Sequence, residues 1–323
     1  MFRRRRFIAA AGSALGLAAL EARAQALGGR PVRIIVAQTT GTTPDLLART
    51  LAPRLQARLG QPFIVENRVG AAGAIGMEAV AKAPPDGATI NVNVSSTLTI
   101  PLFFPKAGFD VHTSFAPITM LASNIFALSV HQSVPATNLR EFIDWVKARA
   151  GRVNYGSPGN GTHHHLIMEQ FRLQTGLEMT HIPYKGSAQA FADLIGGQID
   201  AMFLPMGPAR NFARDGKVRI LGGSARERSP LTPDEPSLHE QGVRDFHADA
   251  WFAAWGPAGL PAELVTRYAE ALHAALAEPE VRDSLAKQGV SVRTSTPEEL
   301  ARINRAEYET LARVVREARI KGD

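Results

Sequence analysis

The sequence of 323 residues contains no cysteine, and this absence excludes several kinds of protein. A chain without cysteine forms no disulfide and no thiolate metal site, so a buried core must stabilise its fold. It also offers no cysteine to which a lipid anchor could be attached after export. A length of about 300 residues is sufficient for such a core and suggests two domains.

Hydrophobic runs long enough to cross a membrane are missing as well. The apolar run at residues 8–20 is shorter than the roughly 20 residues that a membrane span needs. It follows four arginines at residues 3–6 and precedes small residues at Ala24 and Ala26. This order is typical of an export signal over residues 1–26 that is cleaved between Ala24 and Ala26, and the arginines also fit twin-arginine export. We therefore expect a periplasmic protein whose mature chain does not insert into a membrane.

Positive charge is scarce once this segment is set aside. The formal net charge is +6, but residues 1–24 hold five arginines and one glutamate, which together contribute +4 and leave about +2. Proteins that bind nucleic acids carry a strongly basic surface, which this balance does not provide. We therefore expect no nucleic-acid partner.

The sequence lacks a complete catalytic motif. A serine hydrolase needs Gly-x-Ser-x-Gly, but Tyr155 stands where Ser157 would need the first glycine. A hydrolase that pairs Ser157 with His165 or His181 remains an alternative, although nothing supplies the third member of a triad.

Cofactor and metal signatures are incomplete in the same way. Gly159 and Gly161 begin a dinucleotide fingerprint, but His164 occupies the place of its third glycine. Consecutive residues on a helix point about 100° apart, so the imidazoles of residues 163–165 cannot converge on one ion. Lys185 could form a Schiff base if it were buried, but the sequence around it is typical of an exposed turn. We expect no cofactor and no metal.

What the chain does contain is an alternation of short apolar runs and helical patterns. Strands are expected at residues 33–37, 63–66 and 89–94, with helices between them. The first helix starts near Pro44, and Pro53 inside it predicts a kink or a late start. Such alternation indicates an α/β fold with parallel βαβ units.

Two further apolar runs connect the halves of the chain. Residues 116–130 are expected to form one extended strand that carries the chain from a first domain to a second. Residues 248–255 are expected to bring it back. Between them, the stretch 155–203 repeats the order strand, polar turn and helix twice.

Polar, glycine-rich turns stand before helices or at strand ends. They occupy residues 39–43, 70–76, 95–97 and 157–162. The first turn of a helix leaves backbone N–H groups free and carries partial positive charge, so it holds carboxylates or phosphates well. In an open α/β sheet these turns gather at the carboxyl ends of the strands, which predicts an anion-binding site.

The amino-acid sequences of these turns and of the segments around them resemble those of one family. The segments that carry the resemblance are VENR followed by GAAGAIG, then AVAKAPPDGATI, NYGSPGNGTHHHL, HIPYKGSAQAFADLIGGQIDAMF, ERSPLTPDEPSLHEQGV, GPAGLP and TPEEL. In this order they resemble the substrate-binding proteins of tripartite tricarboxylate transporters, also called the Bug family of periplasmic receptors. The resemblance covers essentially the whole mature chain.

The resemblance implies a two-domain periplasmic-binding-protein fold (type II-like, a Venus flytrap) in which the chain crosses the hinge twice. With the crossings expected above, residues 27–122 and 250–323 would form the first α/β domain and residues 123–249 the second. The ligand would be a small carboxylate: a dicarboxylate, an acidic amino acid or an aromatic acid. Backbone amides, hydroxyls and water would hold it in the interdomain cleft.

The resemblance also implies partners. The receptor, a monomer, would deliver its ligand to the membrane permease subunits of a tripartite tricarboxylate-type transporter. A receptor that reports its ligand to a membrane signalling kinase would use the same closed state and remains an alternative. The residues expected to line the site are Gly41, Thr42, Thr43, Asp45, Ala71, Ala72, Gly73, Ser95, Ser96, Thr97, Ser157, Asn160, His165, Tyr184, Lys185 and Gly186.

The first ligand loop departs from the family pattern Pro-Phe-Pro-Pro-Gly-Gly-x-Thr-Asp. Gly41 and Asp45 match, whereas threonines replace the two prolines of the loop and Thr42 replaces the second glycine. Pro44 replaces the threonine and removes one N–H donor. A β-branched residue tolerates positive φ poorly, so Thr42 puts the shape of the loop in question. We expect Asp45 to organise this loop or cap the next helix rather than contact an anion.

Overall fold

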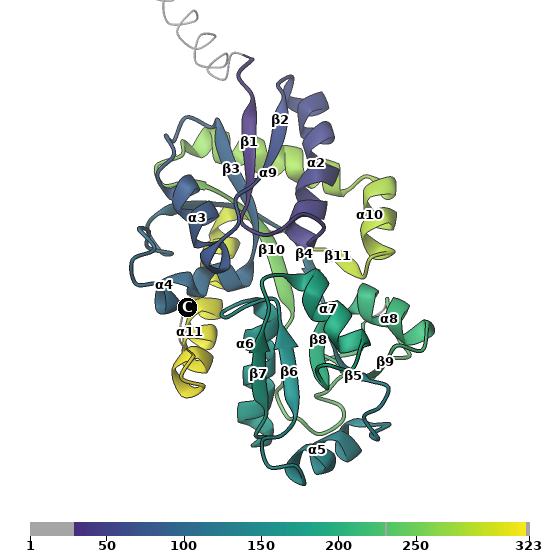
Figure 1. The fold of residues 1–323 in the computed structure, drawn as a ribbon. Coiled ribbons are helices and arrows are strands. Elements are labelled where there is room, and N and C mark those ends of the chain that lie inside the picture. The colour runs from purple at the N-terminus through teal and green to yellow at the C-terminus, as the bar shows by residue number, and fades with distance from the viewer. Residues whose placement is uncertain (1–28, 230, 321–323) are drawn as a thin grey trace, which may run out of the picture.

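The computed structural model describes residues 29–229 and 231–320. The expected export signal at residues 1–26 lies outside the described residues. Two β-sheets with helices packed on them form two lobes, which lie one above the other in Figure 1. Within the described part of the chain, no helix combines the length and the apolar character that crossing a membrane requires.

The first lobe is built on a six-stranded sheet in the order β11-β4-β10-β3-β1-β2. β1, β2 and β3 are parallel, whereas β10 runs antiparallel to β3 and β4. The parallel strands confirm the βαβ units expected from the sequence. The strands are β1 (Val32–Val36), β2 (Phe63–Asn67), β3 (Thr89–Val94), β4 (Phe115–Asn124), β10 (Ala250–Pro257) and β11 (Val290–Val292).

The second lobe is built on a five-stranded sheet in the order β7-β6-β8-β5-β9. β6 is parallel to both β7 and β8, and β5 is antiparallel to β8 and β9. The strands are β5 (Phe126–His131), β6 (Asn154–Ser157), β7 (Thr180–Pro183), β8 (Ala201–Pro205) and β9 (Val218–Gly223).

Helices follow the strands as the alternating pattern predicts. The first lobe holds α2 (Thr43–Leu59), the 3-10 turns η1 (Ala71–Gly73) and η2 (Ser95–Thr99), α3 (Ala74–Ala81), α4 (Ile100–Phe103), α9 (Ala262–Leu276), α10 (Pro279–Ala286) and α11 (Pro297–Glu317). The second holds α5 (Leu139–Lys147), α6 (His163–Thr175), α7 (Ser187–Ile195) and α8 (Met206–Arg214).

Helix α2 tolerates the proline inside it. It begins at Thr43, with Pro44 in its first turn, and continues through Pro53. The late start expected from Pro53 is therefore wrong, because buried leucines on the apolar face hold the helix against the sheet. Gly60 ends α2 with φ 71°, the left-handed conformation that glycine adopts without strain.

The chain crosses between the lobes at two adjacent places. β4 ends at Asn124 and β5 begins at Phe126, so the run expected to form one strand is in fact two strands in different sheets. The return crossing lies between β9 and β10. Ser224 joins the crossings, because its N–H donates to Phe126 O over 2.7 Å and its Oγ accepts from Phe126 N over 2.9 Å. The Oγ also donates to Asp249 Oδ1 over 2.7 Å, just before β10.

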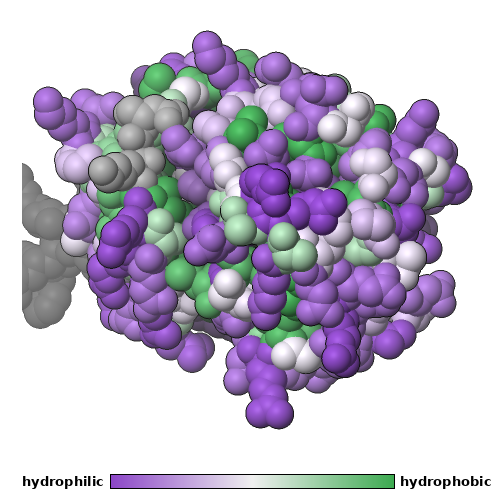
Figure 2. Space-filling view, turned by 60° about the horizontal axis from the view of Figure 1, so that its bottom comes forward, coloured by the Kyte–Doolittle hydropathy of each residue, from purple (hydrophilic) through white to green (hydrophobic). Residues whose placement is uncertain are grey.

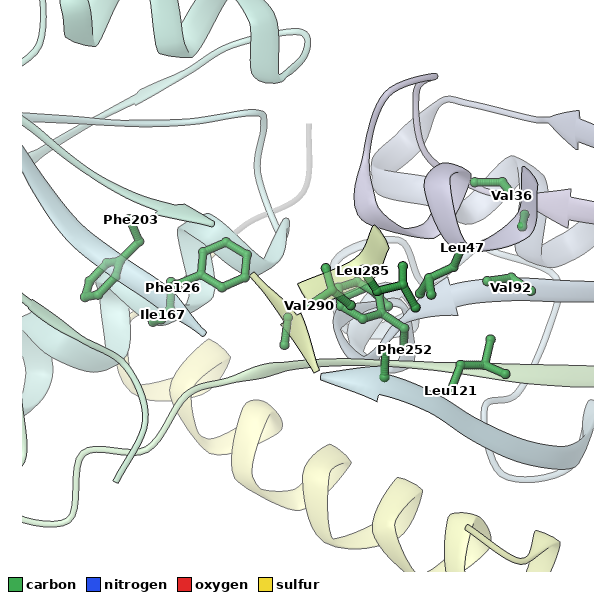
Figure 3. Close-up of a cluster of buried hydrophobic side chains, with 14 of the residues drawn as sticks. Val36, Leu47, Val92, Leu121, Phe126, Ile167, Phe203, Phe252, Leu285 and Val290 are labelled. Atoms are coloured by element: carbon green, nitrogen blue, oxygen red, sulfur yellow. The ribbon is translucent and has the colours of Figure 1, made fainter. Parts of the chain in front are cut away.

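One cluster of buried apolar side chains extends through both lobes. Figure 3 shows Val36, Leu47 and Phe252 on its first-lobe side and Phe126 and Phe203 on its second-lobe side. Near the end of the chain, α11 packs across the gap onto α6. Because this contact buries apolar side chains from both lobes, it holds them together on one side.

Candidate ligand-binding cleft

The carboxyl ends of the parallel strands in the two sheets face each other. The turns that follow β1, β2 and β3 lie at the lower edge of the first lobe in Figure 1, and those that follow β6 and β7 lie at the upper edge of the second. Every turn named in the sequence analysis as a ligand contact lies at one of these two edges. The topology thus brings turns of both lobes to the facing edges of the two sheets.

Asp45 organises the first loop, as its position predicts. The residue is 2% exposed, and its carboxylate accepts hydrogen bonds from Gly41 N over 3.0 Å, Arg49 Nε over 3.0 Å and Asn67 Nδ2 over 2.9 Å. Burial alone would raise the pKa of the Asp45 carboxyl, but these hydrogen bonds and the charge of Arg49 lower it below its usual value. Asp45 is therefore an ionised anchor inside the protein.

The unusual threonine of this loop is accommodated without strain. Gly41 takes the positive φ of 84°, whereas Thr42 has φ −79° and ψ 162° and is the N-cap residue of α2. The Thr42 hydroxyl donates to Thr39 O over 2.7 Å. Thr42 therefore does not disturb the shape of the loop, because the residue that takes the left-handed conformation is still a glycine.

Two asparagines that the sequence analysis did not select hold the loop from behind. Asn93 Oδ1 accepts from Ala37 N over 2.8 Å and is fully buried in β3. Asn67 Nδ2 donates to Gln38 O over 3.1 Å as well as to Asp45. Asn67 lies in the VENR segment, so the resemblance of this segment to the family could have indicated it. Only the sheet pairing brings Asn93 next to β1.

The second turn contains four consecutive residues with positive φ. These are Gly70 at 126°, Ala71 at 46°, Ala72 at 53° and Gly73 at 104°. A residue with a Cβ pays roughly 1–2 kcal/mol in this region, and such strain concentrates at functional sites. Gly76 lets the turn approach the first loop, since a Cβ there would lie 2.8 Å from the Cβ of Ala37.

The third turn, η2, supplies a buried hydroxyl with no partner. Ser95 follows the carboxyl end of β3 and is 0% exposed, and among the described residues its Oγ has no hydrogen-bond partner. Ser96 is buried too, and the Thr97 hydroxyl donates to Val94 O over 2.7 Å. A buried hydroxyl without a partner is costly. The Ser95 Oγ is one of several buried polar atoms of this lobe without a partner among the described residues, and both side-chain polar atoms of Asn91 in β3 are others.

In the second lobe, the hydroxyl of Ser157 is already engaged by neighbouring residues of the same lobe. Its Oγ lies 2.7 Å from His181 Nε2 and 3.0 Å from Gly159 O, and its side chain is buried. The His181 ring also stacks on the ring of His165, with centroids 3.9 Å apart and an angle of 12° between the planes. The pair Ser157–His181 thus exists, but it is part of a packed ring stack.

The three consecutive histidines point in different directions, as helix geometry predicts. His163 Nε2 lies 3.1 Å from Ala248 O, and His165 Nδ1 accepts from Gly161 N over 3.1 Å. Both nitrogens of His164 are buried and lack partners among the residues described. Burial lowers the pKa of His163 and His165 to about 4 and that of His164 to about 3. All three are therefore neutral near neutral pH.

The last turn carries Tyr184, Lys185 and Gly186. The Tyr184 hydroxyl donates to Asp193 Oδ2 over 2.8 Å, and burial together with this bond raises its pKa to about 12. Tyr184 N donates to Ser157 O over 2.9 Å, which places this turn beside that of residues 157–162. Lys185 is exposed at the edge.

The two lobes touch at the cleft through a glycine. A Cβ on Gly161 would lie 2.8 Å from the ring of Phe103, which belongs to α4 of the first lobe. η2 of the first lobe also contacts α6 of the second. Within the first lobe, a Cβ on Gly73 of η1 would lie 3.2 Å from the Cβ of Ala37 and 3.5 Å from Cδ1 of Ile100.

Two lobes, two crossings and facing polar turns define a two-domain periplasmic binding protein. The family of tripartite tricarboxylate transporter receptors matches residues 47–320. The chain belongs to that family.

Solved structures of similar proteins agree. The periplasmic binding protein BugD is 30% identical, with a TM-score of 0.82 over 91% of this chain and 99% of that one. An R. palustris protein with adipate is 31% identical, with a TM-score of 0.84 over 90% and 98% of the two chains. MatC from Rhodopseudomonas palustris with bound malate is 29% identical, with a TM-score of 0.81 over 88% and 99%.

These relatives decide between the alternatives for Ser157. The family and its solved members are solute-binding proteins, so this chain is a solute-binding receptor of a transport system and not an enzyme. The hydrolase alternative is wrong. The contact between Ser157 and His181 instead fixes the turn at residues 157–162 against β7.

Proposed function

We propose that this receptor binds a small dicarboxylate between its lobes through backbone N–H groups, hydroxyls and water. The observation that carries the proposal is the buried Ser95 Oγ, which has no partner among the described residues and belongs to η2, the turn that contacts α6 of the second lobe. Helices α2 and α6 both begin at the cleft, and their first turns favour negative charge. The similar proteins solved with adipate and malate hold dicarboxylates, which supports this ligand class over an aromatic acid.

The neutral surroundings of the turns support the same mode of binding. The one carboxylate of the first loop, Asp45, is directed inward and neutralised by Arg49. The imidazoles of residues 163–165 are uncharged near pH 7 because burial lowers their pKa values. Apart from Lys185, which is exposed at the edge of the last turn, dipoles and hydroxyls are left to balance the ligand, and water-mediated contacts can complete the shell.

A panel of ligands tests the ligand class. Malate, adipate, glutamate and benzoate are titrated by calorimetry, with the diamide of adipic acid as the uncharged control. We expect a dicarboxylate to bind in competition with any acid that co-purifies and the diamide not to bind. The protein is also unfolded, freed of any acid that co-purified and refolded. If none of the acids binds to this protein, the proposal is refuted.

A matched pair of variants tests the role of the hydroxyl. Ser95→Ala removes a donor to a charged group, which is worth about 1.5–3 kcal/mol, so the affinity should fall roughly tenfold to a hundredfold. Ser129→Ala removes a buried serine hydroxyl in β5, away from the turns, and should leave the affinity unchanged. Equal affinities for the two variants would show that Ser95 does not contact the ligand.

We also propose that residues 27–122 with 250–323 and residues 123–249 move as two bodies about the crossings. A ligand that contacts turns of both lobes binds the closed state better and so shifts the population toward it. Small-angle scattering should show a smaller radius of gyration with ligand. The same measurement tests whether the protein is a monomer.

Export and delivery complete the proposal. The segment at residues 1–26 would direct the chain to the periplasm and be cleaved between Ala24 and Ala26, which mass spectrometry of the mature N-terminus would establish. The closed receptor would then pass its ligand to the permease subunits of a tripartite tricarboxylate-type transporter. Uptake that survives deletion of the receptor gene would contradict this role.

A further inference from the structure

A hollow lies at the end of the second lobe that faces away from the first lobe. It is a groove of about 520 Å³ between α5, the end of α6 and the loop at residues 241–244. α6 starts at the cleft with His163, and Gln174 in the groove lies eleven residues later, about 16 Å along the helix axis at 1.5 Å per residue. In Figure 1, α5 is at the bottom of the lobe, far from the first sheet.

The groove is rimmed by cations without counter-ions. Arg140, Lys147 and Arg244 line it, its lining includes no carboxylate, and none of the three forms an ion pair with any described residue. Two nearby carboxylates are engaged elsewhere. Glu141 accepts from Thr137 N over 2.7 Å, and Asp245 pairs with Arg226 at 3.4 Å. Asp144 is exposed on α5, four residues after Arg140 and three before Lys147, so it offsets part of their charge, but it does not line the groove. The charged side chains that line the groove are therefore all positive.

The floor of the groove is apolar. Leu139 and Val243 are buried at its base, and Ile143 is half-buried beside them. Gln241 is bound to the backbone, because its Nε2 donates to Leu221 O over 2.8 Å, so this wall is fixed. Figure 2 turns the bottom of the lobe forward and shows hydrophilic side chains with small hydrophobic patches between them.

We propose that this groove docks an acidic polypeptide segment that also carries an apolar side chain. A free inorganic anion would leave the exposed part of Ile143 uncovered, and a flat lipid surface would not enter a hollow. The volume falls in the range of roughly 300–1,000 Å³ of sites that take a drug-sized ligand, which corresponds to a few residues of a peptide. Opposite charges on the two surfaces raise the association rate and select the partner.

The groove lies wholly within one lobe. All residues that line it fall between positions 139 and 244, so opening and closing of the cleft leave its shape unchanged. The docking surface is thus separate from the ligand site and available in either state. Its test does not depend on which carboxylate the cleft binds.

The test uses the whole receptor and a fluorescent eight-residue peptide of alternating glutamate and leucine. Binding is followed by polarisation at low salt and at about 0.15 M salt, where screening reaches about 8 Å. The groove variant carries Arg140→Glu, Lys147→Glu and Arg244→Glu. The control variant makes the same change in charge at three exposed cations of the first lobe, Lys106→Glu, Arg302→Glu and Arg305→Glu.

We expect the groove variant to bind the peptide at least tenfold more weakly than the natural protein and the control variant to differ by less than about threefold. Equal weakening by the two variants, or no binding of the peptide at low salt, would overturn the proposal. Binding of anionic phospholipid vesicles without the peptide, or displacement of the peptide by millimolar phosphate, would assign the groove to a lipid or a free anion and would also overturn it.

Two measurements guard against misfolding. Circular dichroism melts compare all variants, and Lys147→Glu alone serves if the triple change unfolds the lobe, with an expected loss of roughly threefold. Malate or adipate binding in the cleft is measured on the same samples. A groove variant that keeps cleft binding but loses the peptide supports the proposal, whereas failure of cleft binding in every sample bears only on the proposed ligand.

Discussion

Acidification should destabilise this protein through histidines that it buries without charge. Residues 163–165 open α6, where the partial positive charge of the helix end also disfavours imidazolium. The pKa of His164 is lowered to about 3, first by burial and then by its neighbour His163. An unfolded histidine titrates near pH 6.5. Below about pH 6.5, the unfolded chain therefore binds protons at these histidines that the folded chain does not bind.

The sign and the size of the change in the free energy of unfolding follow from this difference in pKa between the folded and unfolded states. Because the folded pKa lies below the unfolded one, the stability is complete above about pH 6.5 and is lost as the pH falls toward the folded value. At about pH 5, some 1.5 units below the unfolded pKa, His164 should cost at most about 2 kcal/mol at 1.36 kcal/mol per unit. His163 and His165, with pKa values lowered to about 4, act in the same direction.

Carboxyl groups whose pKa is raised by burial oppose this trend, and Glu307 is an example. Burial raises the pKa of Glu307 to about 7, so the folded state holds its proton more tightly than the unfolded chain does. That group makes the protein more stable as the pH falls from about 7 to its ordinary value near 4.5, which partly offsets the histidines. A variant that removes a single histidine separates the two effects.

His164→Phe is that variant. The His164 ring packs edge-on against Phe126, with centroids 4.9 Å apart, and its nitrogens have no partner to lose among the described residues. Phenylalanine keeps the ring and removes two unsatisfied polar atoms, so at about pH 7.5 the variant should be at least as stable as the natural protein.

Urea denaturation at about pH 7.5, 6.5, 5.5 and 5 measures the difference. The advantage of His164→Phe should grow by roughly 2 kcal/mol between the first and the last pH. A difference that stays constant with pH would refute the reasoning, because it would mean that His164 ionises equally in the folded and unfolded states.

Two further predictions concern backbone conformation. Ala72→Gly should be neutral or stabilising by up to about 1 kcal/mol because Ala72 has φ 53°, whereas Ala79→Gly in α3 should cost about 1 kcal/mol in thermal melts. Equal losses for the two would contradict strain at Ala72. Gly161→Ala should weaken ligand binding roughly tenfold, because the new Cβ would meet the ring of Phe103 at 2.8 Å and disturb the contact between the lobes. Combining it with Phe103→Leu should restore part of the affinity, and no recovery would point to the φ of 72° at Gly161 alone.

Local chemistry in the sequence was enough to predict many elements. The strand expected at residues 89–94 is β3 (Thr89–Val94), and Thr296 caps α11 locally by accepting from Glu299 N over 3.1 Å. Glycine at position 41 marked the one residue of its loop that needs positive φ. Such features depend on neighbours within a few residues, so the sequence shows them directly.

Features that depend on distant pairing could not be predicted in this way. The apolar run at residues 116–130 carries no local sign that it leaves one sheet at Asn124 and enters another at Phe126. The buried support of the first loop by Asn93 arises because β3 pairs with β1, and a lone asparagine in a strand does not reveal it.

By itself, then, the sequence determined the α/β class, the polar turns before the helices and the family, because these follow from residue types at short spacing. The tertiary structure decided which polar groups remain for a ligand. It directs Asp45 inward, ties Ser157 to His181 and leaves Ser95 buried without a partner among the described residues. The physical reason is that hydrogen-bond satisfaction is settled by strands and helices that meet only in the folded protein.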